Sequence, residues 1–231
     1  MGYPVRGRAR TWFRVALGAP AILFGATVGV LPVFADGLKW HLDSATGWCD
    51  GNCAISFYSG QYVKTPMKSV FGVDEAKAVW DWKWDQHYIV GAALSRRILS
   101  VGALDIEPEI GIAQRFGGMH EVEGWAALYF RWTWFPWNHV IRTTAAMATG
   151  LNYASDVNKI EEVRGRVPGG SRLLHYLSPE MTFALPDRPN VELLFRFHHR
   201  SGGGDIWGDS ELFKGVNGGA QFQTIGLRYR F

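Results

Sequence analysis

Cysteine and charge are scarce in this chain. It has two cysteines, Cys49 and Cys53, and only 19% of its residues are charged. A zinc site of the common type needs a second cysteine pair or a matching histidine set, so none is predicted. The cysteine pair leaves two alternatives, a local disulfide in an oxidising compartment and two unpaired thiols. With 47% hydrophobic residues, the composition excludes a disordered protein.

Acidic residues are absent from the first 35 residues, which carry four arginines and then an apolar run that ends at Ala35. Removing this segment takes the formal net charge from +3 to −1, so the remaining domain lacks the basic character of a nucleic-acid binder. The pattern is typical of a cleaved secretory signal peptide. A permanent membrane anchor is the alternative, and Pro20 and Pro32 weaken it as a stable helix. We expect a signal peptide at 1–35 and one domain at 36–231.

Long apolar runs and helical periodicity are both missing after residue 36, whereas alternation with period two recurs. Eight segments are predicted to be strands: 54–65, 84–97, 101–115, 122–134, 139–154, 171–185, 190–201 and 219–231. Longer connections follow the odd-numbered segments, and tight turns, such as 98–100, follow the even-numbered ones. This alternation and an even strand number are typical of a bacterial outer-membrane barrel. The predicted fold is all-β, an eight-stranded antiparallel transmembrane β-barrel of the outer-membrane type.

The two faces of the predicted strands differ in polarity. In the segment 101–115, Asp105 and Glu107 share one face, and Ile110 and Ile112 share the other. A narrow lumen in which acids and arginines pair fits the charged face. A soluble carrier barrel with an apolar interior is the alternative. The signal peptide, the aromatic residues near strand ends and the alternating last strand, which ends in Phe231, favour the membrane barrel.

Two polar residues interrupt the apolar face near the end of the segment 190–201. His199 and Ser201 share that face because residues two apart in a strand point the same way. With both termini on the periplasmic side, the pair lies at the level of the outer leaflet. A hydroxyl beside a base is what nucleophilic ester chemistry needs. Counting from the turns places His175 opposite Ser201 and Gln221 opposite His199.

Three glycines follow the serine, and their backbone N–H groups are candidates to bind an oxyanion: Gly202, Gly203 and Gly204. Taken alone, a histidine and a serine at a strand end also fit an inert pair in the headgroup zone. A glycine run alone also fits the start of a flexible loop.

Four blocks of the chain carry a family resemblance: 107–117, 130–138, 195–202 and 226–231. They resemble the lipid A 3-O-deacylase (acyloxyacyl hydrolase-related) family. The resemblance implies an eight-stranded outer-membrane barrel that removes an ester-linked acyl chain from lipid A. It also implies that His199 is the base and Ser201 the nucleophile, on the outer surface of the barrel.

This chain departs from the family at two positions. Gly202 stands where the family has an asparagine that helps to hold the oxyanion, and Gln221 stands at the position of the orienting acid. Asp205, Asp209 and Glu211 are candidates to replace that acid. A glutamine accepts a hydrogen bond from imidazole but supplies no negative charge.

We therefore expect an outer-membrane serine esterase that acts on lipid A of lipopolysaccharide in the outer leaflet. Neither a metal nor another cofactor is predicted, because the sequence has no metal-ligand spacing and no phosphate-binding glycine loop before a helix. The alternative is a non-catalytic small barrel with a structural or adhesive role. An acid within hydrogen-bond reach of His199 would favour the enzyme. The oligomeric state is left open.

Overall fold

The computed structural model describes residues 39–43, 46–73, 75–202 and 210–231. The predicted signal peptide at 1–35 and four predicted loop residues, Gly203, Gly204, Asp205 and Asp209, lie outside the described residues.

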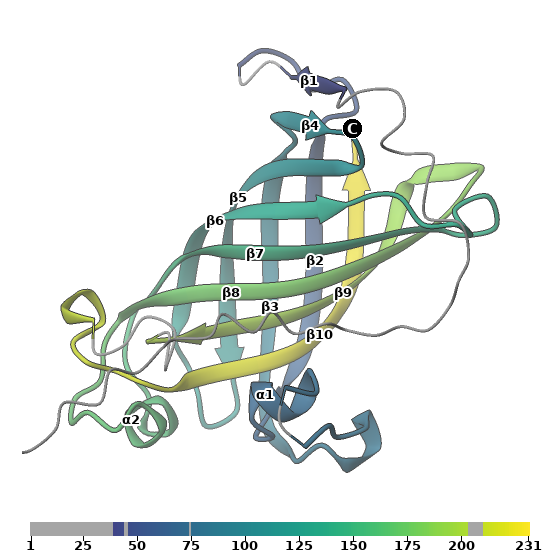
Figure 1. Cartoon of the computed structure of the whole chain (residues 1–231). Coiled ribbons are helices and arrows are strands. Elements are labelled where there is room, and N and C mark those ends of the chain that lie inside the picture. Colours follow the sequence, from purple (N-terminus) through teal and green to yellow (C-terminus); the bar gives the residue numbers. More distant parts are fainter. Residues whose placement is uncertain (1–38, 44–45, 74, 203–209) are drawn as a thin grey trace, which may run out of the picture. The chain divides into compact units, whose positions relative to one another are not determined.

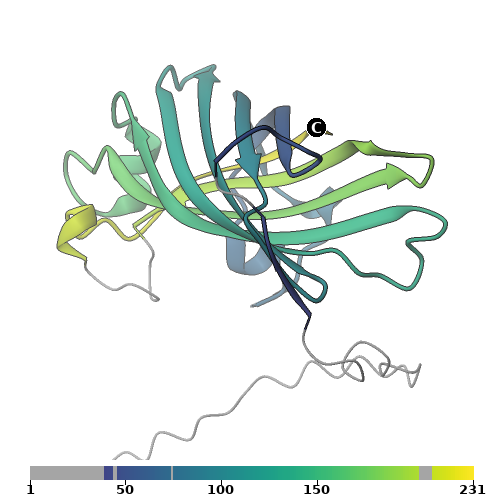
Figure 2. The same ribbon diagram turned by 90° about the horizontal axis from the view of Figure 1, so that it is seen from above.

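Eight antiparallel strands close into a barrel (Figures 1 and 2). They are β2 (Cys53–Val63), β3 (Trp84–Arg96), β5 (Leu104–Phe116), β6 (Val122–Trp132), β7 (Arg142–Ala154), β8 (Leu173–Leu185), β9 (Arg188–Ser201) and β10 (Gly219–Arg230). Each barrel strand pairs with the next along the chain, and β10 pairs with β2 to close the sheet. The eight predicted strands are confirmed, and no observed strand end differs from its predicted position by more than three residues.

One connection differs from the predicted tight turn at 98–100. It contains β4 (Leu99–Val101), which pairs both with the start of β5 and with β1 (Trp40–Leu42). Strands of three residues are too short to show a periodic pattern, which is why the sequence did not reveal them. Just before the barrel begins, Cys49 and Cys53 form a disulfide, so the first of the two alternatives for this pair is correct.

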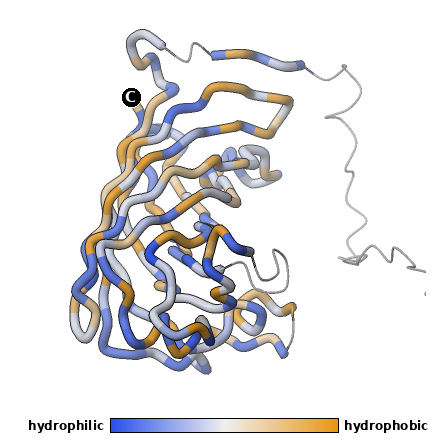
Figure 3. Tube along the Cα trace, turned by 90° about the vertical axis from the view of Figure 1, so that its left-hand side faces the viewer, coloured by the Kyte–Doolittle hydropathy of each residue, from blue (hydrophilic) through white to orange (hydrophobic). Residues whose placement is uncertain are grey.

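The barrel is charged inside and apolar outside. Hydrophobic and hydrophilic residues alternate along the strands (Figure 3). Glu107 is fully buried in the lumen, whereas Ile110 and Ile112 are 62% and 58% exposed on the outer face. The predicted face assignment is therefore confirmed, and a carrier barrel with an apolar cavity is excluded.

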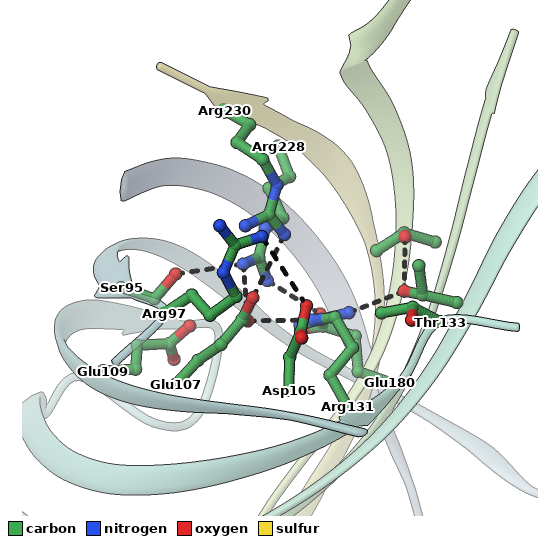
Figure 4. A network of polar contacts seen from close by, with 12 residues as sticks. Ser95, Arg97, Asp105, Glu107, Glu109, Arg131, Thr133, Glu180, Arg228 and Arg230 are labelled. Atoms are coloured by element: carbon green, nitrogen blue, oxygen red, sulfur yellow. Dashed lines mark hydrogen bonds and ion pairs between the residues drawn. The ribbon is translucent and has the colours of Figure 1, made fainter. Parts of the chain in front are cut away.

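Arginine–glutamate pairs fill the lumen (Figure 4). The Nε of Arg131 donates to Oε2 of Glu107 at 2.9 Å, and its Nη2 donates to Oε1 of Glu180 at 2.5 Å. Arg196 donates to Glu180 at 2.7 Å and to both carboxylate oxygens of Glu109. All five side chains are buried. Pairing of this kind offsets the large cost of removing charges from water.

The connections 64–83, 117–121, 155–172 and 202–218 meet at one end of the barrel, called here the long-loop end, opposite the C-terminus (Figure 1). The described parts of these connections form four short helices: α1 (Met67–Val70), α2 (Lys159–Gly165) and the 3₁₀ turns η1 (Val79–Asp81) and η2 (Glu211–Phe213). The side chain of Asn158 caps α2, and Glu161 from this helix pairs with buried Arg115 at 2.8 Å, which ties α2 to the lumen. None of the described helices is both long and apolar enough to cross a membrane.

Candidate active site on the outer face of the barrel

The predicted pair lies together on the outward face of β9. Nε2 of His199 is 3.0 Å from Oγ of Ser201. That separation is within the range of about 2.6–3.2 Å expected between a nucleophile and its base. Phe195 and Phe197 precede the pair on the same face, so the two polar residues end an apolar run at the long-loop end.

Both neighbouring strands bring a polar residue to the pair. His175 on β8 lies in register with Ser201, and Gln221 on β10 lies in register with His199, as the turn counting predicted. On β7, Oγ1 of Thr149 is 2.8 Å from Nε2 of His175. We call Thr149, His175, His199, Ser201 and Gln221 the outer polar cluster.

Gln221 stands at the position where the sequence resemblance predicts an orienting acid. Its Nε2 donates to the carbonyl oxygen of Thr65, and its side chain also interacts with the ring of His199. Because the amide presents its NH₂ group to Thr65, its carbonyl oxygen is the atom suited to accept from Nδ1–H of His199. Within the described residues, that Nδ1 has no hydrogen bond of regular geometry. The histidine is therefore accompanied by a neutral acceptor.

Glu211, predicted as a substitute acid, does not reach the histidine. It is exposed in η2, and no contact between Glu211 and His199 exists in the described part of the chain. The reason is the packing of the turn. Phe213 points inward, where it packs with Leu174 and Val216, so Glu211 faces away from the barrel.

Gly202 differs from its predicted role as an oxyanion donor. Its N–H already donates to the carbonyl oxygen of Gly218 at 3.2 Å. A Cβ atom at this position would lie 1.4 Å from the carbonyl oxygen of Val216, so an asparagine has no room here. The close approach of these two backbone segments therefore requires glycine and engages its N–H within the fold.

The connection between β2 and β3 covers part of the outward face. The ring centroid of Phe71 lies 5.3 Å from that of Phe197, and the centroid of Trp82 lies 6.5 Å from it. As a result Phe197 is only 3% exposed, whereas Phe195, two residues away on the same face, is 37% exposed. The contact between Thr65 and Gln221 extends this cover to the β10 side of the outer polar cluster, where Gln221 is buried.

An apolar groove of about 330 Å³ lies on the same face, next to the cluster. Its walls include Phe71, Met181, Phe183, Phe195, Phe197 and Gln223. Phe197 is two residues from His199 along β9, and Gln223 is two residues from Gln221 along β10. The groove therefore approaches the cluster from the apolar middle of the barrel.

Some residues of this site were not found from the sequence. Thr149 lies on a predicted strand, and the alternation with period two puts it on the outward face. That alternation was the signal available for it. Thr65 and Phe71 lie in an irregular connection and gave no signal. Among the described residues, no group of three or more histidine, cysteine, aspartate or glutamate side chains is arranged to hold a metal ion.

No protein-family model and no curated protein sequence matches the chain. Two solved structures are similar to it. One, described as de novo design of transmembrane β-barrels, is 9% identical with a TM-score of 0.44, and the alignment covers 78% of this chain and 96% of the other. The second, neisserial surface protein A (NspA), is 11% identical with a TM-score of 0.46, covering 79% and 98%. The fold assignment rests on the strand pairing of this chain itself, and the resemblance to lipid A deacylases stays a prediction.

Proposed function

We propose that the protein is an outer-membrane esterase that removes an ester-linked 3-O acyl chain from lipid A. The observation that carries the proposal is the 3.0 Å contact between Ser201 and His199 on the outward, apolar face of a closed barrel. A serine–histidine pair on this face meets lipid rather than the lumen. Esters within reach of such a pair are those of membrane lipids.

The distribution of polarity supports the membrane location. A charged interior with an apolar exterior is the pattern of a barrel that spans a bilayer. In such barrels the short turns face the periplasm and the longer loops face outward, which puts the long-loop end at the outer leaflet. Lipid A of lipopolysaccharide is then the lipid beside Ser201, in a protein exported with a cleaved signal peptide.

The residues present suffice for acyl transfer to serine. Oγ of Ser201 attacks the ester carbonyl carbon as its proton passes to Nε2 of His199, and the carbonyl oxygen becomes an oxyanion. Collapse breaks the bond between the acyl carbon and the sugar oxygen, which takes the proton from His199. Water then attacks the acyl-serine with His199 again as base. This second step releases the fatty acid and regenerates Ser201.

Gln221 is the neighbour suited to orient the histidine for this role. A carbonyl oxygen that accepts from Nδ1–H keeps Nε2 as the acceptor for the serine proton. Glutamine does not stabilise the imidazolium by charge, and loss of that charge from a triad costs about 10⁴ in turnover. We therefore expect a slow enzyme, in which the apolar groove beside Phe197 holds the acyl chain to be removed.

The second candidate is a small barrel with a structural or adhesive role. The neutral residue beside His199 and the engaged N–H of Gly202 favour it, since both are departures from an efficient hydrolase.

Mass spectrometry of lipid A from cells that express the protein tests the proposal. We expect loss of one hydroxyacyl chain with the wild type and no loss with Ser201→Ala. Ser59→Ala is the control, because Ser59 is a second serine on the outward face but lies on β2, away from His199. Unchanged lipid A with a folded wild-type barrel would overturn the esterase and leave the non-catalytic role.

A further inference from the structure

An esterase of this kind needs a hydrogen-bond donor for the oxyanion. Removal of one such donor typically costs about 10²–10³ in turnover. Here the N–H of Gly202 is engaged by Gly218, and an asparagine side chain is excluded by Val216. Within the described residues, which leave out Gly203 and Gly204, the donor must then come from a side chain near Ser201.

The strand register points to one side chain. Ser201 has two in-register neighbours, His175 on β8 and Gly219 on β10. Gly219 has no side chain, so His175 is the side chain directly opposite the serine. Cβ atoms of such a pair lie about 4.5–5.5 Å apart, which brings an imidazole within reach of an atom bonded to Ser201 Oγ. His199 lies two residues before Ser201 on the same outward face, so the strand register puts both histidines next to the same serine.

Thr149 orients the ring of His175. Its hydroxyl lies 2.8 Å from Nε2. When the threonine donates to Nε2, the proton of the neutral ring is on Nδ1, and Nδ1 becomes a donor. Gln221 and Thr149 thus set the tautomers of two different rings. Gln221 leaves a hydrogen-bond acceptor, Nε2 of His199, for the serine proton, whereas Thr149 leaves a donor, Nδ1–H of His175, for the oxyanion. His199 and His175 thereby take opposite roles on either side of the attack.

Resting on the proposed esterase function, we propose that His175 is a further catalytic residue, which donates a hydrogen bond to the oxyanion formed when Ser201 attacks the ester. Thr149 is its positioning residue. His199 serves as the base in contact with Ser201, so it is not the donor to the oxyanion.

The test is steady-state kinetics of the full-length protein in detergent, with lipid A as substrate. His175→Leu is expected to lower kcat by about 10²-fold while KM changes by less than about threefold. His175→Asn, which keeps an amide donor near the position of Nδ1, should recover part of that loss. Thr149→Val should lower kcat by about tenfold, the size of a neutral hydrogen bond of about 1.4 kcal/mol. His139→Leu is the control, since His139 is exposed in the connection at the opposite end of the barrel.

A second readout separates this role from the choice of substrate. A fluorophosphonate probe reacts with an activated serine by forming an O–P bond and releasing fluoride, while His199 takes the serine proton. Labelling of Ser201 should be slowed in His175→Leu by a factor similar to that in kcat. Heat-dependent migration in gels checks that each variant is folded. If His175→Leu does not fold, His175→Asn and Thr149→Val carry the comparison.

Each result decides one point. Kinetics of His175→Leu within threefold of the wild type, with Ser201→Ala inactive, overturn the role of His175 and leave the esterase intact. A raised KM with unchanged kcat overturns it too, because it assigns His175 to ground-state binding. Labelling of the wild type without lipid A cleavage overturns only the substrate, and the labelling rates then judge His175. A wild type that does neither overturns both proposals.

Discussion

The lumen and the outer polar cluster are two polar regions of one barrel with opposite organisation. In the lumen glutamates accept hydrogen bonds from arginines, as Glu180 does from Arg131 and Arg196. On the outside, His199 and Ser201 contact each other beside a neutral glutamine. Formal charges thus concentrate where other charges neutralise them, and the outward cluster is built from neutral hydrogen-bonding groups.

This difference teaches how the barrel separates stability from chemistry. A buried charged network stabilises a single arrangement and leaves little freedom for reaction. Neutral polar groups on an apolar surface cost less free energy than charged groups would. Their protons are also the ones that a reaction can move. Variants from each region should therefore change different properties.

The largest effect on stability is expected in the lumen. Glu180→Leu leaves Arg131 and Arg196 without a shared carboxylate, and removing one partner from a buried ion pair costs about 3–5 kcal/mol. Urea unfolding in lipid vesicles measures the loss. Glu75→Leu, at an exposed position, should stay within about 0.5 kcal/mol. A loss below 1 kcal/mol in Glu180→Leu would show that the network is not a source of stability.

Gln221→Glu tests the outer polar cluster. A carboxylate has no proton to donate to the carbonyl oxygen of Thr65, and an unsatisfied buried group costs about 1–3 kcal/mol. We expect lower stability by that amount, and a kcat at least tenfold higher, because the carboxylate supplies the charge that Gln221 lacks. Lipid A turnover and urea unfolding measure the two quantities. An unchanged or lower kcat would show that the site is built around the neutral amide.

Phe71→Ala tests the cover rather than the chemistry. It removes the ring that packs on Phe197 and opens one wall of the groove. We expect KM for lipid A to rise severalfold with kcat nearly constant, and stability to fall by about 0.5–1.5 kcal/mol, the value of an aromatic pair. Val73→Ala, in the same connection and 73% exposed, is the control. Equal KM values for the two variants would separate the groove from substrate binding.

The smallest effect belongs to an ion pair outside both regions. The Nε–H of Arg97 donates to Asp43 at 2.8 Å, and this hydrogen bond lowers the pKa of Asp43 below its ordinary value of 3.8. A lowered pKa in the folded state stabilises the protein above pH 3.8, and this contribution is lost as the pH falls through the folded pKa. Asp43→Asn should cost at most about 1 kcal/mol at pH 7, and this cost should shrink as the pH falls below 3.8. A larger loss at pH 2 than at pH 7 would contradict this assignment.

The sequence predicted what depends on the period of a strand. The eight strands, their inward and outward faces, and the register of His175 with Ser201 follow from alternation and from short turns. The cover by Phe71 and the link between α2 and Arg115 did not follow, because the long connections have no period. Nor did the obstacle at Gly202, since it depends on how closely the backbone at Val216 approaches.

The contacts in the lumen also constrain how the barrel is made. Arg196 on β9 pairs with Glu109 on β5, and Arg131 on β6 pairs with Glu180 on β8, so these partners come from strands that are not adjacent. A single hairpin entering hydrocarbon would carry charges whose partners have not arrived. We expect biogenesis to proceed through a species that keeps its interior hydrated until β10 meets β2, followed by insertion in one cooperative step. Detection of a stably inserted fragment that lacks β9 and β10 would argue for stepwise assembly instead.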